Sequence, residues 1–545
     1  MRGKRIISLT AAVLAGAMFL TSCGGGKSAT DGSGSSAKVS GVNEFPIVEE
    51  PTTLSIFCEK TASIEDITSN AFTKWYEEKT NVKIEWNLIN GDVRQAINLQ
   101  IASDDYSDIF QGFGFARSEQ VAYYDQGVYI DIADLIDEHG YYIKEMFASD
   151  PEIEKELRHT DNKIFGLPTL ELDFAGDAPY KMWVYKPWMD KLGAKIPETT
   201  DEFYELLKRF KTEDPNGNGI ADEIPLAARN SRGGQIGLDM FLMNSFVTWG
   251  KYGFYNDNGK AVFAPITDEA KEGIKYMNKL YQEGLIHPDS FIMDRARVTA
   301  IAENDVPILG AATGKWTTQF TVAGADTNRM NEFVGVPPLK GPSGVKQTVY
   351  GQTDPGCTWF SITTACENPA AAIKWIDWFY SEEAYLATKA TEGMRLANEG
   401  ELGLDGQPAK YALDEIDGAS VGDAIQNERW LSFALGYWPR EKSIQLKDNT
   451  IDATRKQNAY EAYKLYDPYV VKGKIIGDFP VPSDISEEYL ELRANITSAI
   501  DSGFVSFVIG EKNIETDWDA YVQNFYKLGL ERYTEIIQNY IDTLK

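Results

Sequence analysis

The oxygen-bearing side chains between residues 214 and 223 have the spacing of a metal-binding loop. The segment is Asp214-Pro-Asn-Gly-Asn-Gly-Ile-Ala-Asp-Glu223. Oxygen side chains at alternate positions, a glycine at the sixth position and a backbone carbonyl at the seventh wrap a loop around one hard cation, as in the first half of an EF-hand loop. We therefore expect a structural calcium site with the ligands Asp214, Asn216, Asn218, the Ile220 carbonyl, Asp222 and Glu223.

The loop departs from an EF-hand at its end. The twelfth position, where an EF-hand has a bidentate glutamate, is Pro225. The closing carboxylate must therefore come from Glu223, with Asp222 beside it. The alternative is a polar Asn-Gly turn that binds no ion.

A second chemical signal is the cysteine that follows the N-terminal apolar segment. Basic residues stand among the first five positions, and Ile6 to Leu20 is apolar but too short to span a bilayer comfortably. The segment ends on Leu20-Thr21-Ser22-Cys23, which has the pattern of a bacterial lipobox. We expect a signal peptide over 1–22 and a lipid on the Cys23 thiol, the alternative being an ordinary signal peptide with an incidental cysteine.

The composition after Cys23 restricts the class of protein. Residues 24–41 are almost entirely Gly, Ser, Ala, Asp and Lys, a composition that forms a flexible linker. The chain has 53 Lys+Arg against 82 Asp+Glu, a formal charge of −29, which disfavours binding to nucleic acid. Its 12 Trp and 28 Tyr suit stacking on the apolar faces of sugars, although any single ring is more often part of a core.

Cysteines and histidines give no sign of catalysis. An odd number of cysteines follows Cys23, and their spacing is not that of zinc ligands. The sequence does not decide whether Cys357 and Cys366 form a disulfide bond. The histidines are far apart and stand beside no G-x-S-x-G motif. We expect no enzymatic activity. The remaining cysteine after Cys23 is Cys58, and the three histidines are His139, His159 and His287.

The elements that must position these residues alternate between strands and helices. Thr53–Phe57 and Val82–Trp86 read as strands, and 64–79 and 92–102 as helices between and after them, followed by a strand at 108–110. Such alternation favours βαβ units on a mainly parallel sheet, which binds ligands beyond the carboxyl ends of its strands. A capping box, Thr199 to Glu202, predicts the start of a helix directly before the calcium loop. Further helices are predicted over 267–283, 368–380 and 518–544.

These residues together resemble the family 1 extracellular solute-binding proteins. Within that family the chain is similar to the lipoprotein branch that includes alginate-oligosaccharide-binding and LplA-like proteins. The match covers nearly the whole mature chain. It is carried by the lipobox, Leu54-Ser-Ile-Phe57, Ile101-Ala-Ser-Asp-Asp-Tyr-Ser-Asp-Ile109, Phe165-Gly-Leu-Pro168, Trp183-Val-Tyr-Lys-Pro-Trp188 and, above all, the Asp214 to Glu223 loop.

The resemblance implies an α/β fold with two lobes, of the class II periplasmic-binding type, a ligand cleft between lobes that close by hinge bending, and extra C-terminal helices. It also implies that the calcium ligands of the relatives match those named above. A family segment that contacts ligand resembles Ala397-Asn-Glu399-Gly400, with Ala397 in place of the first glycine. The expected organisation is a signal peptide (1–22), a lipidated linker (23–44), the first lobe (45–165), the second lobe (166–300), returns to the first lobe (301–365) and to the second (366–505), and a helical tail (506–545).

A sugar is bound by aromatic rings that stack on its faces and by carboxylates that accept hydrogen bonds from its hydroxyls. We therefore expect ligand contacts from acidic and aromatic residues near strand ends and in the later loops. Trp183 and Trp188 are instead expected in the core of the second lobe. With Glu399 from the resemblance, the predicted ligand contacts are Glu59, Trp316, Tyr350, Glu399, Trp430, Tyr437 and Trp438.

The function these observations favour is that of an extracellular, lipid-anchored solute-binding protein of an ABC importer. It would bind an oligosaccharide, deliver it to the permease, and act as a monomer with no nucleic-acid partner. The alternatives are a peptide-binding receptor, a secreted glycoside hydrolase, whose two carboxylates an acidic chain could supply, and a surface adhesin, which should show repeats. The sequence leaves open whether the sugar is neutral or uronic.

Overall fold

A computed structural model gives the fold of the protein. It describes residues 38–544 apart from 62–63, 160, 172–173, 235, 352–353, 389–393, 414–426, 431–434, 439–443 and 447–450. Cys23, the predicted signal peptide and most of the predicted linker therefore lie outside the described residues. Among the described helices, none has both the length and the apolar character needed to cross a membrane.

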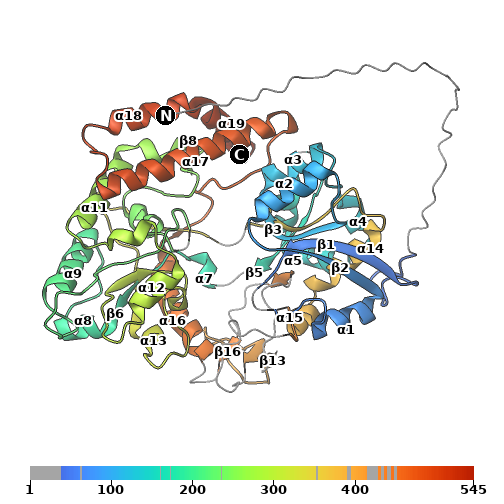
Figure 1. The fold of residues 1–545 in the computed structure, drawn as a ribbon, viewed down its shortest axis with the longest axis horizontal. Helices are drawn as coiled ribbons and strands as arrows, with labels where there is room; N and C mark the ends of the chain where they lie inside the picture. Colours follow the sequence, from blue (N-terminus) through green and yellow to red (C-terminus); the bar gives the residue numbers. More distant parts are fainter. Residues whose placement is uncertain are drawn as a thin grey trace, which may run out of the picture. The chain divides into compact units, whose positions relative to one another are not determined.

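The first lobe is built on a mixed sheet of order β2-β1-β3-β12-β4 (Figure 1). β1 pairs in parallel with β2 and β3, and β12 runs antiparallel to β3 and to β4. The parallel pairs confirm the predicted βαβ units. The strands are β1 (Thr52–Glu59), β2 (Val82–Ile89), β3 (Ile109–Phe115), β4 (Leu167–Pro168) and β12 (Thr358–Ile362).

The helix predicted over 64–79 begins later, at Ala71. The Asn70 side chain accepts a hydrogen bond from the Phe72 amide and so caps α1 (Ala71–Thr80). Residues before Asn70 form turns, because Asp66 accepts hydrogen bonds from Thr68 and from the Ser69 hydroxyl. The next helix, α2 (Val93–Ser103), starts where predicted, with Asp92 as its cap.

The first lobe contains further helices and short strands besides the five-stranded sheet. Its core gathers large aromatic side chains from α1, α14 and η5, with Tyr76 hydrogen-bonded to the Trp375 carbonyl at 2.6 Å. These elements are α3 (Arg117–Asp125), α4 (Ala133–His139), α5 (Tyr142–Ser149), α6 (Pro151–Leu157), β5 (Leu170–Glu171), α14 (Pro369–Asp377), η5 (Trp378–Tyr380), α15 (Glu382–Thr388), β13 (Met394–Leu396), β14 (Tyr411–Leu413), β15 (Tyr437–Trp438) and β16 (Ile444–Leu446).

The second lobe contains an antiparallel sheet of order β10-β6-β9. Trp183 and Trp188 are buried in its core, as predicted, and the Trp183 indole donates a hydrogen bond to the Gly314 carbonyl at 2.8 Å. The strands are β6 (Met182–Tyr185), β9 (Ala311–Thr313) and β10 (Phe333–Val336). The short elements of this lobe are α7 (Phe174–Asp177), α10 (Leu238–Leu242), η1 (Met243–Ser245), β7 (Phe254–Asp257), β8 (Lys260–Phe263), η2 (Ala264–Ile266), η3 (Pro288–Phe291), η4 (Thr317–Gln319), α13 (Arg329–Glu332), β11 (Thr348–Val349), η7 (Asp467–Tyr469), β17 (Val470–Val471) and η8 (Ser483–Ile485).

The predicted capping box sets the start of α9 (Thr200–Thr212). The Thr199 hydroxyl accepts from the Glu202 amide at 3.1 Å, and the Glu202 carboxylate accepts from the Thr199 amide at 3.1 Å. One face of α9 then buries Phe203, Leu207 and Phe210 in the core. The capped helix ends directly before the predicted calcium loop. The other helices that pack on this core within the first part of the lobe are α8 (Lys186–Leu192), α11 (Asp268–Gln282) and α12 (Arg295–Ala302).

The C-terminal tail is helical, as predicted, and its helices pack on the second lobe. They are α16 (Ile451–Tyr466), α17 (Ser486–Ile509), α18 (Trp518–Lys527) and α19 (Leu530–Thr543), with α17 against α11. The predicted single helix over 518–544 is divided because Gly529 has φ of 91°, a conformation that favours glycine.

The crossings between lobes differ from the predicted boundaries. Residues 301–365 were expected to return to the first lobe, but β9 and β10 pair with β6 in the second, and the first lobe resumes only with β12. Likewise, α14 and η5, within the segment 366–505, belong to the core of the first lobe, and the second lobe resumes with α16. Apolar periodicity identifies an element but does not say which sheet it joins, so the crossings could not be read from the sequence.

Candidate functional site

The carboxyl ends of β1, β2 and β3 meet at one edge of the first-lobe sheet because these strands run in parallel. Glu59 is the last residue of β1 and its side chain is exposed at this edge. Open α/β sheets bind ligands beyond the carboxyl ends of their strands. The structure therefore places Glu59 where a ligand contact was predicted.

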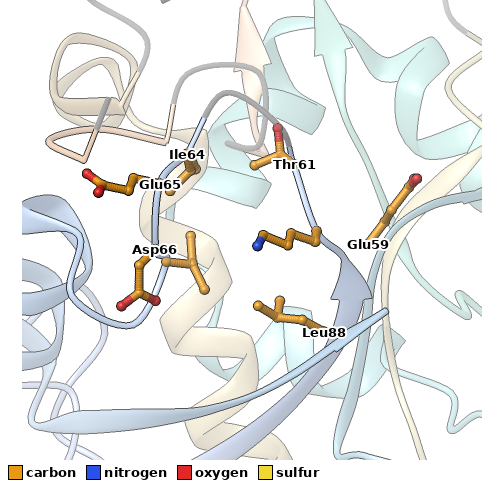
Figure 2. Close-up of a pocket in the computed structure, with 8 residues that line it drawn as sticks. Glu59, Thr61, Ile64, Glu65, Asp66 and Leu88 are labelled. Atoms are coloured by element: carbon orange, nitrogen blue, oxygen red, sulfur yellow. The ribbon is translucent and has the colours of Figure 1, made fainter. Parts of the chain in front are cut away.

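A cavity of about 170 Å³ lies beyond the ends of β1 and β2 (Figure 2). Its apolar part is formed by Ile64, Ile67 and Leu88. Pockets that enclose a whole drug-sized ligand have about 300–1,000 Å³, so this cavity has room for part of a larger molecule. Its polar side chains are Glu59, Lys60, Thr61, Glu65 and Asp66.

Asp66 fixes one wall of this cavity. Hydrogen bonds from Thr68 and Ser69 lower the pKa of Asp66, so its carboxylate stays charged. The Asp66 amide donates to the Asn427 side chain at 3.2 Å, which ties the loop after β1 to a segment far along the chain. The wall is therefore acidic and held in place from two directions.

Aromatic rings that the sequence reasoning missed lie at the end of β3. The half-buried Phe113 ring is 5.3 Å from the Phe57 ring and 5.8 Å from the Phe115 ring. Gly114 has φ of 60°, and a β-carbon there would lie 3.3 Å from the half-buried Trp359 ring. The Gly-Phe-Gly-Phe sequence at 112–115 was the signal that could have found them, because glycines inside a strand indicate a close approach of another group.

The second lobe places Trp316 in a group of aromatic rings just beyond β9. Its half-buried ring is 6.1 Å from Phe174, which is in turn 5.3 Å from Tyr460. The Arg455 guanidinium lies 5.6 Å from the Trp316 ring. Trp316 is thus packed on the core and partly accessible, with the Lys315 ammonium also 5.6 Å from its ring, and the accessible part can stack on a ligand. Tyr460 was not predicted, since its position on α16 gives no local sign of a site.

Tyr350 lies where the chain leaves the second lobe. Its amide donates to the Val471 carbonyl at 3.2 Å, and the Lys472 ammonium is 5.0 Å from its half-buried ring. The ring is partly accessible, and its role as a ligand contact stays a prediction.

Trp430 is a correction to the predicted ligand contacts. Only 1% of it is exposed, its ring stacks on Phe379 at 5.3 Å, and its indole donates to the Thr73 hydroxyl at 2.8 Å. Trp430 therefore fills the core of the first lobe and cannot touch a ligand.

The remaining predicted contacts are not brought together. Tyr437 is half-buried against the first core in β15, which pairs with β5. Trp438 is also in β15, but its side chain is outside the described residues. Glu399 is exposed in the turn that follows β13. β13 belongs to a separate small sheet of order β13-β14-β16.

The predicted calcium loop has a compact, oxygen-rich geometry. The Asp214 carboxylate accepts from the Gly217 amide at 2.9 Å and from the Gly219 amide at 3.1 Å. Gly217 and Gly219 have φ of 78° and 74°, which is the reason for glycine at both positions. The Asn216 and Asn218 side-chain oxygens accept from backbone amides two residues on, and each keeps a second lone pair.

One carboxylate oxygen of this loop is left without a partner, although the Lys191 ammonium donates to the Asp214 carbonyl at 3.2 Å. The Glu223 Oε1 atom is buried and has no hydrogen-bond partner. Burial, followed by the nearby charges of Asp222 and Asp214, raises the pKa of Glu223. Within the described residues, no group of three or more His, Cys, Asp or Glu side chains has metal-binding geometry, so a cation here would depend on amide and carbonyl oxygens as well. This donor set fits a hard cation such as calcium.

Residues 61–385 match the family described as bacterial extracellular solute-binding protein. The chain belongs to this family. The chain is 26% identical over 557 residues to the fructooligosaccharide ABC transporter substrate-binding protein FusA of Streptococcus pneumoniae, which covers 99% of this chain and 97% of that protein. It is 25% identical over 357 residues to the lipoprotein LipO of Bacillus subtilis, covering 64% of this chain and 66% of LipO.

Solved structures share the fold. FusA in complex with kestose superposes with a TM-score of 0.72 at 23% identity, covering 90% of this chain and 99% of that one. A FusA EF-hand mutant in complex with fructo-nystose superposes with a TM-score of 0.71 at 22% identity and with the same coverage of both chains. An HMO-binding solute-binding protein of Bifidobacterium longum infantis gives 0.75 at 24% identity, covering 91% and 99%. These neighbours confirm the two-lobed α/β fold, and the family confirms that the protein binds a solute and is not an enzyme.

Proposed function

We propose that the protein is the oligosaccharide receptor of a bacterial ABC importer. The observation that carries this proposal is the end-to-end match to FusA, whose name states a fructooligosaccharide ligand. Two features of the structure support it: the cavity with charged side chains after β1 and the partly accessible Trp316 ring beyond β9. A sugar offers apolar faces to rings and hydroxyls to carboxylates, so both features suit it.

In this proposal Trp316 stacks on a sugar face and Glu59 accepts hydrogen bonds from hydroxyls. Contacts that form only when both lobes touch the ligand favour the closed arrangement, and the permease would recognise the closed form. The receptor acts outside the membrane as a monomer. Cys23 carries the lipid that holds it there, which the lipoprotein name of LipO supports.

Calcium is the proposed structural ion of the 214–223 loop. Asp214, Asn216, Asn218, the Ile220 carbonyl, Asp222 and Glu223 would hold it. The ion would supply the positive charge that the buried Glu223 oxygen lacks. One solved FusA structure is that of an EF-hand mutant, which supports a loop of this kind in a relative.

A thermal-shift screen tests the proposal. Mature protein with calcium is scanned with fructooligosaccharides, other neutral oligosaccharides, uronic oligosaccharides and short peptides, and each mixture is then analysed for products. We expect at least one oligosaccharide to raise the melting temperature and to remain intact. Stabilisation by peptides alone, or cleavage of a glycan, would refute the oligosaccharide receptor.

Substitution of Trp316 tests the proposed stacking. Trp316→Ala should weaken binding of the identified sugar by about tenfold to a hundredfold, as expected for a lost aromatic contact of about 1.5–3 kcal/mol. Tyr526→Ala is the matched control, because Tyr526 is 45% exposed on α18. Titration calorimetry of both variants gives the comparison, and equal affinity for Trp316→Ala and wild type would remove Trp316 from the site.

A further inference from the structure

The N-terminus of α3 in the first lobe is capped by a residue of the second lobe. The preceding residue, Ala116, has no side-chain oxygen for this purpose. Asp478, in the segment between β17 and α17, accepts from the Ser118 amide at 3.2 Å and from the Ser118 hydroxyl at 3.0 Å. The side chain of Asp478 is 8% exposed. A helix N-terminus needs such an acceptor, so each lobe completes the other at this point.

Arg117, the first residue of α3, adds a second set of contacts at the same place. Its guanidinium donates to the Asp478 carbonyl at 3.2 Å and to the Asp354 carboxylate at 2.8 Å, and it forms an ion pair with Glu156 of α6. The Arg117 side chain is 4% exposed. Asp354 lies in the segment that crosses from the second lobe back to β12.

The crossing segment is packed directly against Arg117. A β-carbon on Gly356 would lie 1.7 Å from the Arg117 Nε atom, so no other residue fits there without displacing the guanidinium. The Gly356 amide donates to the Asp354 carboxylate at 2.9 Å, and the Gly356 carbonyl accepts from Gln120 of α3 at 2.8 Å. α3 and the crossing segment are therefore joined by hydrogen bonds as well as by charge.

Arg493 of α17 completes the cluster from the second lobe. It forms an ion pair with the Asp478 carboxylate and has a side chain 13% exposed. Its guanidinium lies 5.3 Å from the Tyr252 ring and 5.4 Å from the Tyr489 ring, which hold it in place. The chain of contacts runs from α6 through α3 to Asp478 and α17, and so links both cores.

We propose that this cluster of Glu156, Arg117, Asp354, Asp478 and Arg493 is the pivot of the two lobes, which stays intact while they open and close. Within the cluster the Arg117, Asp478 and Arg493 side chains are at most 13% exposed, whereas Glu156 and Asp354 are 35% and 39% exposed. Separating the three buried charges would leave uncompensated charge, so these contacts resist being broken in each cycle. The cluster also contacts Asp354 and Gly356 of the segment that crosses between the lobes, and hinges are formed by a few such loop residues. The pivot rests on the proposed hinged receptor, but it concerns residues that touch no sugar.

A fixed pivot limits the arrangements that the ligand-free lobes sample. Loosening it increases that freedom, and binding must then remove more conformational entropy, which weakens the apparent affinity. A latch that holds the lobes open has the opposite sign, because breaking it favours closure and strengthens the apparent affinity. The direction of the change therefore distinguishes a pivot from a latch.

The experiment compares Asp478→Ala and Asp478→Asn with the control Asp484→Asn in the mature protein. Asp484 is exposed in the neighbouring η8. Small-angle scattering without ligand reports the spread of interlobe distances, and calorimetry reports the dissociation constant for the sugar identified above. We expect Asp478→Ala to broaden the distance distribution and to weaken binding about tenfold, Asp478→Asn to do so about threefold, and Asp484→Asn to match wild type.

Unchanged scattering, or tighter binding by the Asp478 variants, overturns the pivot. If Asp478→Ala does not fold, Asp478→Asn, which keeps an acceptor for Ser118, decides the outcome alone. If the wild-type protein binds no oligosaccharide, the proposed function fails, and the scattering arm still tests the pivot by itself.

Discussion

The two lobes offer different chemistry near the ends of their sheets. The edge of the first lobe has charged side chains of both signs, Glu59, Lys60, Glu65 and Asp66, beside an apolar part. The corresponding region of the second lobe has the Trp316 ring, backed by Phe174 and with Arg455 close by. A carbohydrate has both hydroxyl groups and apolar faces, so one lobe suits hydrogen bonding and the other suits stacking. We therefore expect that neither lobe alone binds the sugar strongly.

The largest expected effect separates a core tryptophan from the stacking one. Trp430→Ala should lower the free energy of unfolding by about 3–5 kcal/mol, because it leaves a cavity among Phe72, Phe379 and the neighbouring rings. Chemical denaturation measures it. Sugar affinity of the folded fraction should be unchanged, in contrast to Trp316→Ala. A stable Trp430→Ala variant that has lost sugar binding would show that Trp430 belongs to the site after all.

Removal of calcium should lower the thermal stability of the protein through the 214–223 loop of the second lobe. The proposed ion would stabilise the fold by about 2.7 kcal/mol at a concentration a hundred times its dissociation constant. EDTA should therefore lower the melting temperature, and Asp214→Ala should reproduce the lower value and abolish the response to EDTA. The control is Asp257→Ala, another acid of the second lobe, outside the loop. An equal response to EDTA in wild type and Asp214→Ala would place the ion elsewhere.

Mild acid should lower the folding stability of the protein through His159 in the first lobe. Burial, followed by the charge of Arg117, lowers the pKa of His159 to about 4. The unfolded chain takes up this proton near pH 6.5 but the folded chain does not, so stability is present above pH 6.5 and is lost as the pH falls toward 4. The loss should reach roughly 2 kcal/mol at pH 5. His159→Gln, which removes the titrating group, should flatten this part of the stability profile, and an unchanged profile would contradict the assignment.

The smallest effect concerns the hydrogen-bonding edge. Glu59→Gln keeps the shape of the side chain but removes its charge, and should weaken sugar binding by about 1 kcal/mol, or roughly fivefold. Glu50→Gln, an exposed acid before β1, is the control. Calorimetry on both variants measures the difference. Stronger binding by Glu59→Gln would mean that the ligand is anionic and is repelled by this edge.

The parts of the molecule that the sequence predicted are those encoded within a few neighbouring residues. The Thr199 capping box and the start of the helix near residue 92 each depend on short-range contacts, and each has the predicted local form. The 214–223 loop also contains short-range contacts, such as those that the Asp214 carboxylate accepts from Gly217 and Gly219. Whether the loop holds calcium stays a prediction. The crossings between lobes depend on which strands pair, as β9 does with β6, and no local pattern records that choice.

Long-range pairing also decided which aromatic residues are accessible. Trp316 and Trp430 both lie in irregular segments and looked alike in the sequence. Trp430 is buried because α1 and η5 meet around it, whereas Trp316 has a core on one side only. Tyr460 was missed for the same reason, because its neighbour Phe174 comes from a distant part of the chain.

A crystal structure of the calcium-loaded protein with the oligosaccharide found in the thermal screen would test the central claim most directly. The account predicts an intact sugar with one face on Trp316 and hydroxyls hydrogen-bonded to Glu59, so that both lobes touch a single ligand. A sugar bound to one lobe alone, or at a surface away from both of these residues, would contradict it.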